Sequence, residues 1–281
     1  MSNQRSLKVG IGGHHVDILC RGKEAHSLAE FLFGDLVTRG SDTSVKHYKF
    51  GTDTATGNLA LWDDGTCLYS SESRYLISYF FMNEVIYQCI TDNTTHHAIH
   101  AGTVHRNGVC VALPGGSGRG KSTVTAWLLT QKFHYLTDEL ILLSNDGAVV
   151  PFTRPLNLKS CPEFLSEIVD NNQDRIIAGK EEVMIPHRLL NPDFLGVQIE
   201  VGCFLFPHYD PSVVPKLTEL SAKECGFLLI QSHGNARNHP ALGVPDISNI
   251  AKKCRAFQMT YSCTDDLEML LNQKFLSSLT D

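Results

Sequence analysis

The first 70 residues follow a pattern typical of short strands. Residues 8–20 (KVGIGGHHVDILC) are rich in β-branched side chains that partly alternate with polar ones, as in strands that bury one face. Residues 58–70 (NLALWDDGTCLYS) predict a hairpin, because the Asp64-Gly65 pair favours a tight turn between two apolar runs. The pattern therefore predicts a β-rich part at the start of the chain.

A helical pattern replaces the strand pattern at residues 71–90. Apolar side chains recur there at three- and four-residue intervals, as one face of a helix requires. They are Tyr75, Tyr79, Met82, Val85 and Ile86. Asn83 and Glu84 interrupt this segment, which makes it too short and too polar to span a bilayer. We expect the β-rich N-terminal part to comprise residues 1–92.

The next segment predicts strands on either side of a glycine-rich loop and a helix. Residues 96–116 (HHAIHAGTVHRNGVCVALPGG) indicate two strands joined by a tight Asn-Gly turn. Residues 109–113, in the second strand, are apolar on both faces, as in a central strand. A helix over residues 123–132 follows. Residues 134–152 (HYLTDELILLSNDGAVVPF) then predict a strand, an acidic pair and two further strands.

The C-terminal third mixes strand and helix patterns. Residues 200–210 (EVGCFLFPHYD) predict a strand that ends at Pro207, and residues 221–232 and 264–279 predict helices. Strands that alternate with helices indicate a mixed α/β class. We therefore expect a second part, residues 93–281, with an α/β core and a C-terminal α/β extension.

Composition and charge limit the classes of partner. The chain has 281 residues, of which 42% are hydrophobic and 19% charged, as in ordinary globular proteins. Its net charge of −6 argues against a general nucleic-acid binder, which would show a basic excess. The nine cysteines form no CxxC pair, and the first residues lack the apolar stretch of a signal peptide. We expect reduced thiols, a cytoplasmic protein, and neither a membrane nor a nucleic-acid partner.

The glycine-rich loop has the pattern of a phosphate-binding loop, Gly115-x-x-x-x-Gly120-Lys121-Ser122. Glycines let the backbone curl until successive N–H groups point at an anion, and the next helix directs its positive end at the same place. Lys121 would reach the β- and γ-phosphates of ATP, and the Ser122 hydroxyl would coordinate Mg²⁺. The predicted nucleotide contacts are Gly116, Ser117, Gly118, Arg119, Gly120, Lys121, Ser122 and Thr123.

Two carboxylates and a histidine are expected beside this loop. Asp138 and Glu139 lie 17 and 18 residues after Lys121, at the end of the strand that follows the helix. One carboxylate would hold Mg²⁺, and the other would accept a proton from an attacking hydroxyl. His100 precedes Gly115 by 15 residues, and antiparallel pairing of the two strands would bring it near the acidic pair, where it would steer the protonation of one carboxylate.

Four histidines lie close together in the sequence just before the loop. On a helix, two of them four residues apart would share a face, as zinc-binding pairs do. The segment indicates strand and turn instead, and the chain contains no HExxH pattern. We expect no transition-metal site at His96, His97, His100 and His105.

Together these motifs resemble a known family. The segment from His100 to Lys159 resembles the catalytic core of HPr kinase/phosphorylase and of the wider HPr-kinase-related family. That core is similar to the nucleotide-binding part of phosphoenolpyruvate carboxykinases. The family pattern is a histidine, then G-x-S-G-x-G-K-S, then an aspartate pair. Here the three elements are His100, residues 115–122 and residues 138–139. Residues 151–160 (PFTRPLNLKS) and 203–210 (CFLFPHYD) also resemble family segments.

The resemblance implies a P-loop, HPr kinase/phosphoenolpyruvate carboxykinase-like core and a kinase that uses ATP and Mg²⁺. Asp138 would be the general base, tuned by His100. Ser122 and Glu139 would hold Mg²⁺, with the glutamate in place of the family's second aspartate. The reverse division of roles between Asp138 and Glu139 stays open.

Two basic residues and the acceptor are less defined. Arg154 and Lys159 would contact phosphate or substrate, or would be solvated surface charges. The L-E-x-R-G-x-G segment of the bifunctional enzymes is absent from the sequence. The expected acceptor is therefore a hydroxyl in general, either a serine of a peptide or protein or a small hydroxylated molecule. The alternative is a nucleotide-dependent regulatory or partner-binding protein without an acceptor. The family often assembles, so a homo-oligomer is also an expectation.

Overall fold

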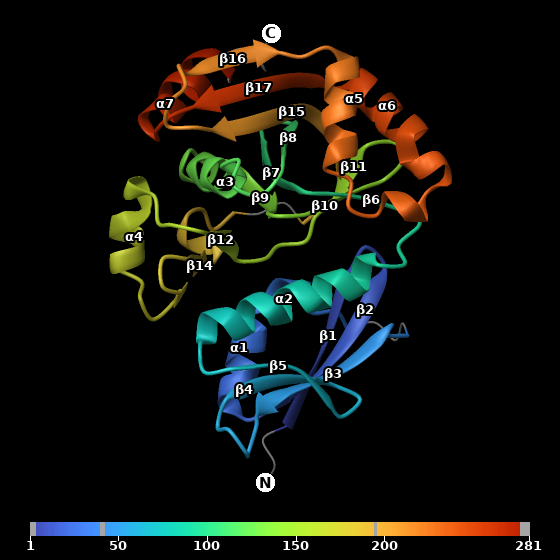
Figure 1. Ribbon diagram of the computed structural model, residues 1–281, viewed down its shortest axis with the longest axis vertical. Coiled ribbons are helices and arrows are strands. Elements are labelled where there is room, and N and C mark those ends of the chain that lie inside the picture. The colour runs from blue at the N-terminus through green and yellow to red at the C-terminus, as the bar shows by residue number, and fades with distance from the viewer. Residues whose placement is uncertain (1–3, 40–42, 194–195, 276–281) are drawn as a thin grey trace. The chain divides into compact units, whose positions relative to one another are not determined.

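The computed structural model describes residues 4–39, 43–193 and 196–275 of a mixed α/β chain with several sheets. The chain forms two compact units. Unit 1 comprises Met1–Asn93, Phe152–Ser160 and Asn172–Pro186. Unit 2 comprises Thr94–Pro151, Cys161–Asn171 and His187–Asp281. Figure 1 labels most of the helices and strands of both units.

Unit 1 contains a five-stranded sheet in the order β1-β2-β3-β4-β5. The strands are β1 (Gln4–Ile11), β2 (His14–Arg21), β3 (Lys46–Thr52), β4 (Leu59–Asp63) and β5 (Thr66–Ser71). The predicted hairpin turn is present, with positive φ at both Asp64 (43°) and Gly65 (82°). Positive φ at both central residues gives the turn a twist that matches its strands.

Two helices pack in unit 1, and only one of them was predicted. The predicted helix is α2 (Arg74–Ile90), which begins after Ser73, whose side chain accepts a hydrogen bond from the Leu76 backbone N–H. The second helix is α1 (Lys23–Phe33), which lies in a region where strands were expected. The segment is helical because its apolar side chains recur at helical spacing and are buried along one face. They are Ala25, Leu28, Ala29, Leu32 and Phe33. Helix α1 also provides the crossover that the parallel β2–β3 pair needs.

A small sheet with the order β12-β14-β13 completes unit 1. Its strands are β12 (Leu156–Leu158), β13 (Ile177–Ala178) and β14 (Val183–Ile185). Both neighbouring pairs are antiparallel.

Unit 2 is built on a nine-stranded sheet with the main order β6-β10-β11-β15-β8-β7-β9, and β17 joins it through β15 and pairs β16. Strand β15 lies between β8 and β17 and is parallel to both, so the carboxyl ends of the three strands lie at one edge of the sheet. The strands are β6 (His97–Ile99), β7 (Ala101–Arg106), β8 (Val109–Pro114), β9 (His134–Thr137), β10 (Ile141–Leu143), β11 (Ala148–Val150), β15 (Ile199–Tyr209), β16 (Lys216–Glu219) and β17 (Arg255–Tyr261).

Helices lie on both faces of this sheet. Helices α5 (Ala222–Gln231) and α6 (Val244–Lys253) bury Leu229 and Ile250 against the face that carries Cys110 and Ala112 of β8. Helix α3 (Lys121–Thr130) covers the opposite face next to β7. Shorter helical segments are α4 (Ser166–Asp170), α7 (Asp265–Leu267), a π-helical turn (Glu268–Phe275) and five 3₁₀ turns: Gly34–Leu36, Glu163–Leu165, His187–Leu189, Ala236–Asn238 and Pro240–Gly243.

The core segment of unit 2 follows the sequence pattern closely. The helix predicted for residues 123–132 and the three strands predicted within residues 134–152 are present, and β8 is a central strand. One strand end differs, because β15 runs through Pro207 to Tyr209. The pairing of β15 with β8 ends at Phe204, so that edge of β15 has no neighbouring strand at Pro207. Proline has no backbone N–H to donate, and this is tolerated where no strand pairs with that edge.

Two further predictions concern the C-terminal helix and the apolar helical segments. The helix predicted for residues 264–279 is present to Phe275, and its last part lies outside the described residues. Among the residues that the structure describes, no helix combines the length and the apolar character needed to cross a bilayer.

Candidate active site

The glycine-rich loop lies where three parallel strands end. It follows β8 directly, and the carboxyl ends of β15 and β17 hold it from the side. The Tyr209 backbone N–H donates to the Arg119 carbonyl (3.2 Å), and the Tyr261 hydroxyl donates to the Gly120 carbonyl (3.3 Å). In open α/β sheets, ligands bind outside the carboxyl ends of parallel strands. The loop occupies this position in unit 2.

The loop conformation requires glycine at two positions. Gly118 and Gly120 have φ of 82° and 86°, in the left-handed region that other residues seldom adopt. A Cβ atom on Gly120 would also lie 1.9 Å from the Tyr261 hydroxyl oxygen. Helix α3 begins at the next residue, so its N-terminal backbone N–H groups face the loop. This curled backbone and the helix end together favour an anion.

Lys121 folds back over this loop. The residue is 5% exposed, and its Nζ donates to the Gly116 carbonyl at 3.1 Å. The loop residues Gly116 to Arg119 are exposed. A buried ammonium group beside exposed backbone gives the loop a positive charge next to a surface that a phosphate can reach.

Ser122 and Asp138 meet at the start of α3. The Ser122 hydroxyl donates to Asp138 Oδ2 at 2.8 Å, and Asp138 is 0% exposed. Gly102 of β7 makes the space for this carboxylate. A Cβ on Gly102 would lie 3.1 Å from Asp138 Oδ1 and 2.4 Å from Thr125 Oγ1. Strand β7 therefore needs glycine where α3 and the carboxylate approach it.

The Ser122–Asp138 pair fits a magnesium ion. Adjacent ligands of an octahedral Mg²⁺ with 2.0–2.1 Å bonds lie about 2.9 Å apart. The two oxygens are 2.8 Å apart, and a hydroxyl with a carboxylate is the donor set that Mg²⁺ takes beside a phosphate. These two side chains are therefore the ones that could hold the ion.

Glu139 points to a different partner from its neighbour. His100 Nε2 lies 2.8 Å from Glu139 Oε1, and the two side chains are 29% and 40% exposed. Glu139 has a φ of 72°, which is strained for a residue with a side chain. The Thr137 hydroxyl donates to the Leu140 carbonyl (2.9 Å) across this turn. The left-handed residue reverses the chain, so Asp138 faces α3 while Glu139 faces His100.

This pairing differs from the expectation drawn from the family resemblance. His100 was expected to tune Asp138, and Glu139 was expected to hold Mg²⁺ with Ser122. The structure pairs His100 with Glu139 and Ser122 with Asp138. The physical reason is the turn at Glu139, which sends the side chains of two successive residues in different directions.

His100 is itself tied to the glycine loop. It lies between β6 and β7. Its backbone N–H donates to the Ser232 carbonyl (2.8 Å), and its own carbonyl accepts from the Gly115 N–H (3.1 Å). The imidazole that contacts Glu139 is therefore fixed relative to the first residue of the loop.

Three contributors to this site carry no recognisable motif in the sequence. Gly102 leaves room for Asp138, and Tyr261 secures Gly120. The Arg119 guanidinium contacts the ring of His208, near the end of β15. Burial and, to a smaller extent, the neighbouring Tyr209 raise the pKa of Tyr261, so its hydroxyl remains a hydrogen-bond donor. These contributions depend on the parallel order of β8, β15 and β17, which sequence patterns do not reveal.

The two predicted basic contacts belong to the other unit. Arg154 is 3% exposed, Lys159 is exposed, and both lie in Phe152–Ser160 of unit 1. The residues predicted from the glycine loop and the acidic pair, with His100, all lie in unit 2. A contact of Arg154 or Lys159 with phosphate or substrate stays a prediction.

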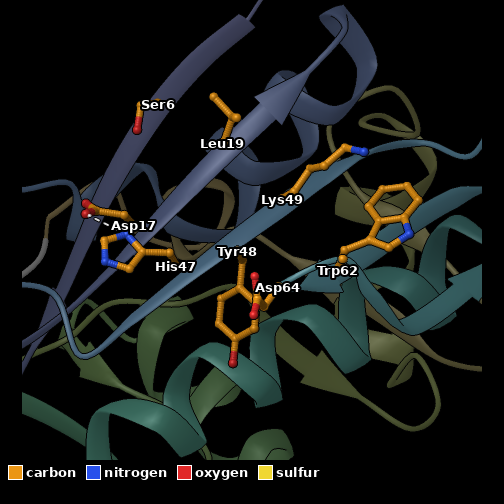
Figure 2. Close-up of a pocket in the computed structure, with 9 residues that line it drawn as sticks. Ser6, Asp17, Leu19, His47, Tyr48, Lys49, Trp62 and Asp64 are labelled. Carbon is orange, nitrogen blue, oxygen red and sulfur yellow. Dashed lines mark ion pairs between the residues drawn. The ribbon is translucent and has the colours of Figure 1, made fainter.

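A groove of about 500 Å³ lies in unit 1 on the face of the five-stranded sheet (Figure 2). Within it, the Lys49 ammonium lies 4.5 Å from the centre of the Trp62 ring, and His47 pairs with Asp17 at 3.3 Å. Tyr48 points instead toward α2, where its hydroxyl donates to Glu84 at 2.6 Å. No residue predicted to bind nucleotide or metal lines this groove.

Comparisons with known proteins give little further information. No family model matches the chain, and no curated protein matches it. Among solved structures, the Hpr(Ser) kinase/phosphatase from Coxiella burnetii is similar over 65% of this chain and 95% of that chain. The sequence identity is 12% and the TM-score is 0.32. Such a likeness is a distant relationship at the level of the fold at most, and it carries no information about the site.

Proposed function

We propose that the chain is a kinase that transfers the γ-phosphate of ATP to a hydroxyl group with the help of Mg²⁺. The observation that carries the proposal is the pair of carboxylates with separate partners beside the glycine loop. Asp138 accepts from Ser122, while Glu139 contacts His100. Phosphoryl transfer needs charge neutralisation and a positioned acceptor more than covalent help from the protein. The arrangement offers one carboxylate for each task.

The phosphate end of ATP would lie against the loop. Backbone N–H groups of the loop and the buried Lys121 would neutralise the phosphates. Ser122 and Asp138 would hold the ion. When bound, Mg²⁺ would supply positive charge that offsets the negative charge developing during transfer. This assigns to Asp138 the metal role that the family resemblance gave to Glu139.

Glu139 would act as the base. Its carboxylate is 40% exposed, so an acceptor can reach it, and the His100 ring keeps it oriented. The acceptor oxygen would lose its proton to Glu139 and form a bond to the γ-phosphorus. The bond from that phosphorus to the β–γ bridging oxygen would break, and ADP would leave. His100, which the family resemblance placed on Asp138, would then position the base.

The acceptor would be a serine of a peptide or protein, or a small hydroxylated molecule. The test is transfer of labelled γ-phosphate from ATP–Mg²⁺ into a mixed pool of serine peptides, proteins and hydroxylated metabolites. Native protein should label one acceptor class. Lys121→Ala should reduce labelling by about 10²-fold to 10³-fold, because it removes a charge that stabilises the transition state. Lys223→Ala, on the exposed face of α5, is the matched control and should label as the native protein does.

Binding of ATP measured on the same samples separates this proposal from its rival. A native protein that binds ATP tightly yet labels nothing would contradict the kinase and favour a nucleotide-dependent binding protein without an acceptor. Turnover retained by Lys121→Ala would contradict the assignment of the loop.

A further inference from the structure

Three histidines from distant parts of the chain meet at the end of β6. They are His97 of β6 and His233 and His239 from the connection between α5 and α6. One ring nitrogen from each lies within 4.8 Å of the others. The segment after α5 reaches β6 through a bridge between His233 and Ile99. All of these residues belong to unit 2. The cluster does not depend on the nucleotide site proposed above.

The spacing of the ring nitrogens suits a tetrahedral cation. Two ligands of a tetrahedral Zn²⁺ with 2.0–2.1 Å bonds lie about 3.3 Å apart. His97 Nδ1 and His233 Nε2 are 3.3 Å apart. The ring of His239 stacks on that of His97 with centroids 4.1 Å apart. The ring nitrogens of the three histidines lie within 4.8 Å of one another, so a shift of the side chains by at most about 1.5 Å would bring them to the tetrahedral spacing.

The outer partners of the rings match those of metal-binding histidines. Such histidines direct their second ring nitrogen to a carbonyl or a carboxylate. His239 Nε2 lies 3.1 Å from the His96 carbonyl, and His97 Nε2 lies 3.5 Å from Asp246 Oδ2. The contact of His239 leaves its Nδ1 as the nitrogen with the lone pair, and the carboxylate near His97 Nε2 favours the same tautomer for His97. His97 Nδ1 is the atom that faces His233.

Two of the three rings are buried. His97 is 0% exposed and His239 is 6% exposed, while His233 is partly exposed. An ion held by the three rings would therefore be shielded from most of the solvent.

The backbone next to the cluster is strained and closely packed. Ala241, Leu242 and Gly243 have consecutive positive φ values of 48°, 57° and 70°. Two of these residues carry side chains, and such strain persists only where the surroundings impose it, often at functional sites. A Cβ on Gly243 would lie 2.9 Å from ring carbons of both His97 and His233. The turn from Pro240 to Gly243 is thus fitted against the histidine rings.

From this geometry we infer a binding site for a divalent transition cation of the zinc class at His97, His233 and His239. Three imidazoles suit Zn²⁺, and a fourth position would be taken by water. Without metal, the proton on His233 Nε2 would lie between His97 Nδ1 and Asn235 Oδ1, which is 3.1 Å away. Ligation of the cation by His233 Nε2 therefore requires the other neutral tautomer, in which the proton moves from Nε2 to Nδ1. Binding would fix β6 to the connection between α5 and α6. His97 and His233, which would be joined in this way, are 136 residues apart in the chain.

The sequence expectation of no transition-metal site rested on histidines that are neighbours in the chain. Of His96, His97, His100 and His105, only His97 belongs to the cluster. Its partners lie in the connection between α5 and α6, far from it in the sequence. Local spacing in the sequence does not reveal a cluster of this kind.

The test is calorimetric titration of full-length, chelator-treated protein with Zn²⁺, repeated with Co²⁺, whose visible absorption reports tetrahedral nitrogen ligation. Native protein should bind one Zn²⁺ at this site and unfold at a higher temperature with the metal. His239→Gln should weaken binding at least about 100-fold, as a lost ligand costs more than a lost outer partner. Asp246→Asn should weaken it about 10-fold, because it alters only the carboxylate behind His97.

Controls separate loss of the site from loss of the fold. His47→Gln changes an exposed histidine of unit 1 and should bind Zn²⁺ as the native protein does. Circular dichroism should show that His239→Gln and Asp246→Asn remain folded. If His239→Gln does not fold, His233→Gln, which changes the partly exposed ring, gives the same test. Native protein that neither binds Zn²⁺ nor gains thermal stability would overturn the inference, as would unchanged affinity in a folded cluster variant.

Discussion

Unit 2 contains two candidate cation sites of contrasting chemistry. Beside the glycine loop, the candidate ligands are oxygen atoms of Ser122 and Asp138, 2.8 Å apart. At the end of β6 they are ring nitrogens of three histidines. Hard cations such as Mg²⁺ prefer oxygen, whereas imidazole favours Zn²⁺ and its neighbours. Under the two proposals, donor chemistry would direct the two metals to different places in one unit.

The two sites also differ in exposure. Gly116 to Arg119 of the loop are exposed, as suits a ligand that enters and leaves with each turnover. His97 and His239 are buried, as suits an ion that stays bound and stabilises the fold. A short segment connects the sites, because His100 follows His97 by three residues. We expect one site to serve chemistry and the other to stabilise the strand that leads to it.

The largest effect that tests this contrast is expected from Asp138→Asn. The change keeps the shape of a buried side chain but removes the charge that Mg²⁺ needs. The Mg²⁺ concentration for half-maximal phosphate transfer should rise about 100-fold. Zn²⁺ affinity at the histidine cluster should be unchanged. Asp174→Asn, which alters an exposed carboxylate, is the control. Equal loss of Mg²⁺ and Zn²⁺ affinity would contradict the separation of the two sites.

A smaller effect, on stability, is expected from Gly102→Ala. The new Cβ would lie 2.4 Å from Thr125 Oγ1, so α3 or the buried carboxylate has to move. We expect the free energy of unfolding to fall by about 1–3 kcal/mol in urea titrations. The further change Thr125→Ala removes that oxygen and should recover part of the loss.

Gly226→Ala in α5 is the matched control for this substitution. Its Cβ would make an ordinary contact of 3.7 Å with Ala251, and alanine favours the helix. It should leave the protein as stable as the native form or slightly more stable. If Gly102→Ala behaves in the same way, the close approach of β7 to α3 is not a constraint on the site.

The smallest effect is expected from Tyr261→Phe. This change removes one long hydrogen bond of 3.3 Å to the Gly120 carbonyl and leaves the packing of the ring intact. The loss of unfolding free energy should be about 0.5–1.5 kcal/mol, accompanied by a modestly lower affinity for ATP. Tyr209 is exposed, and its hydroxyl does not donate to the Gly120 carbonyl. Tyr209→Phe should therefore leave ATP affinity unchanged. An effect of Tyr209→Phe equal to that of Tyr261→Phe would contradict the role given to this bond.

Local patterns predicted the elements around the glycine loop well. The turn at Asn107-Gly108, the helix after the loop and the strand before Asp138 each depend on a few adjacent residues. Helix α1 was not predicted, because Lys23–Phe33 follows a run of strand patterns and its apolar face is short.

The details of the two sites depend on features that sequence spacing does not encode. The different partners of Asp138 and Glu139 follow from a single left-handed residue at Glu139. Sequence alone placed both carboxylates near the loop but could not orient them. The histidine cluster depends on a contact between His97 and His233, which only the folded sheet brings together. Long-range contacts of this kind have no local signature.

In the proposed mechanism, Glu139, held by His100, removes the proton from the acceptor while Asp138 serves the metal. The most direct measurement is the rate of γ-phosphate transfer by native protein and by Glu139→Gln, at saturating Mg²⁺, with ATP affinity measured in parallel. We predict that both proteins bind ATP equally well and that transfer by Glu139→Gln is about 10²-fold to 10⁴-fold slower. Transfer by Glu139→Gln at the native rate would contradict the account.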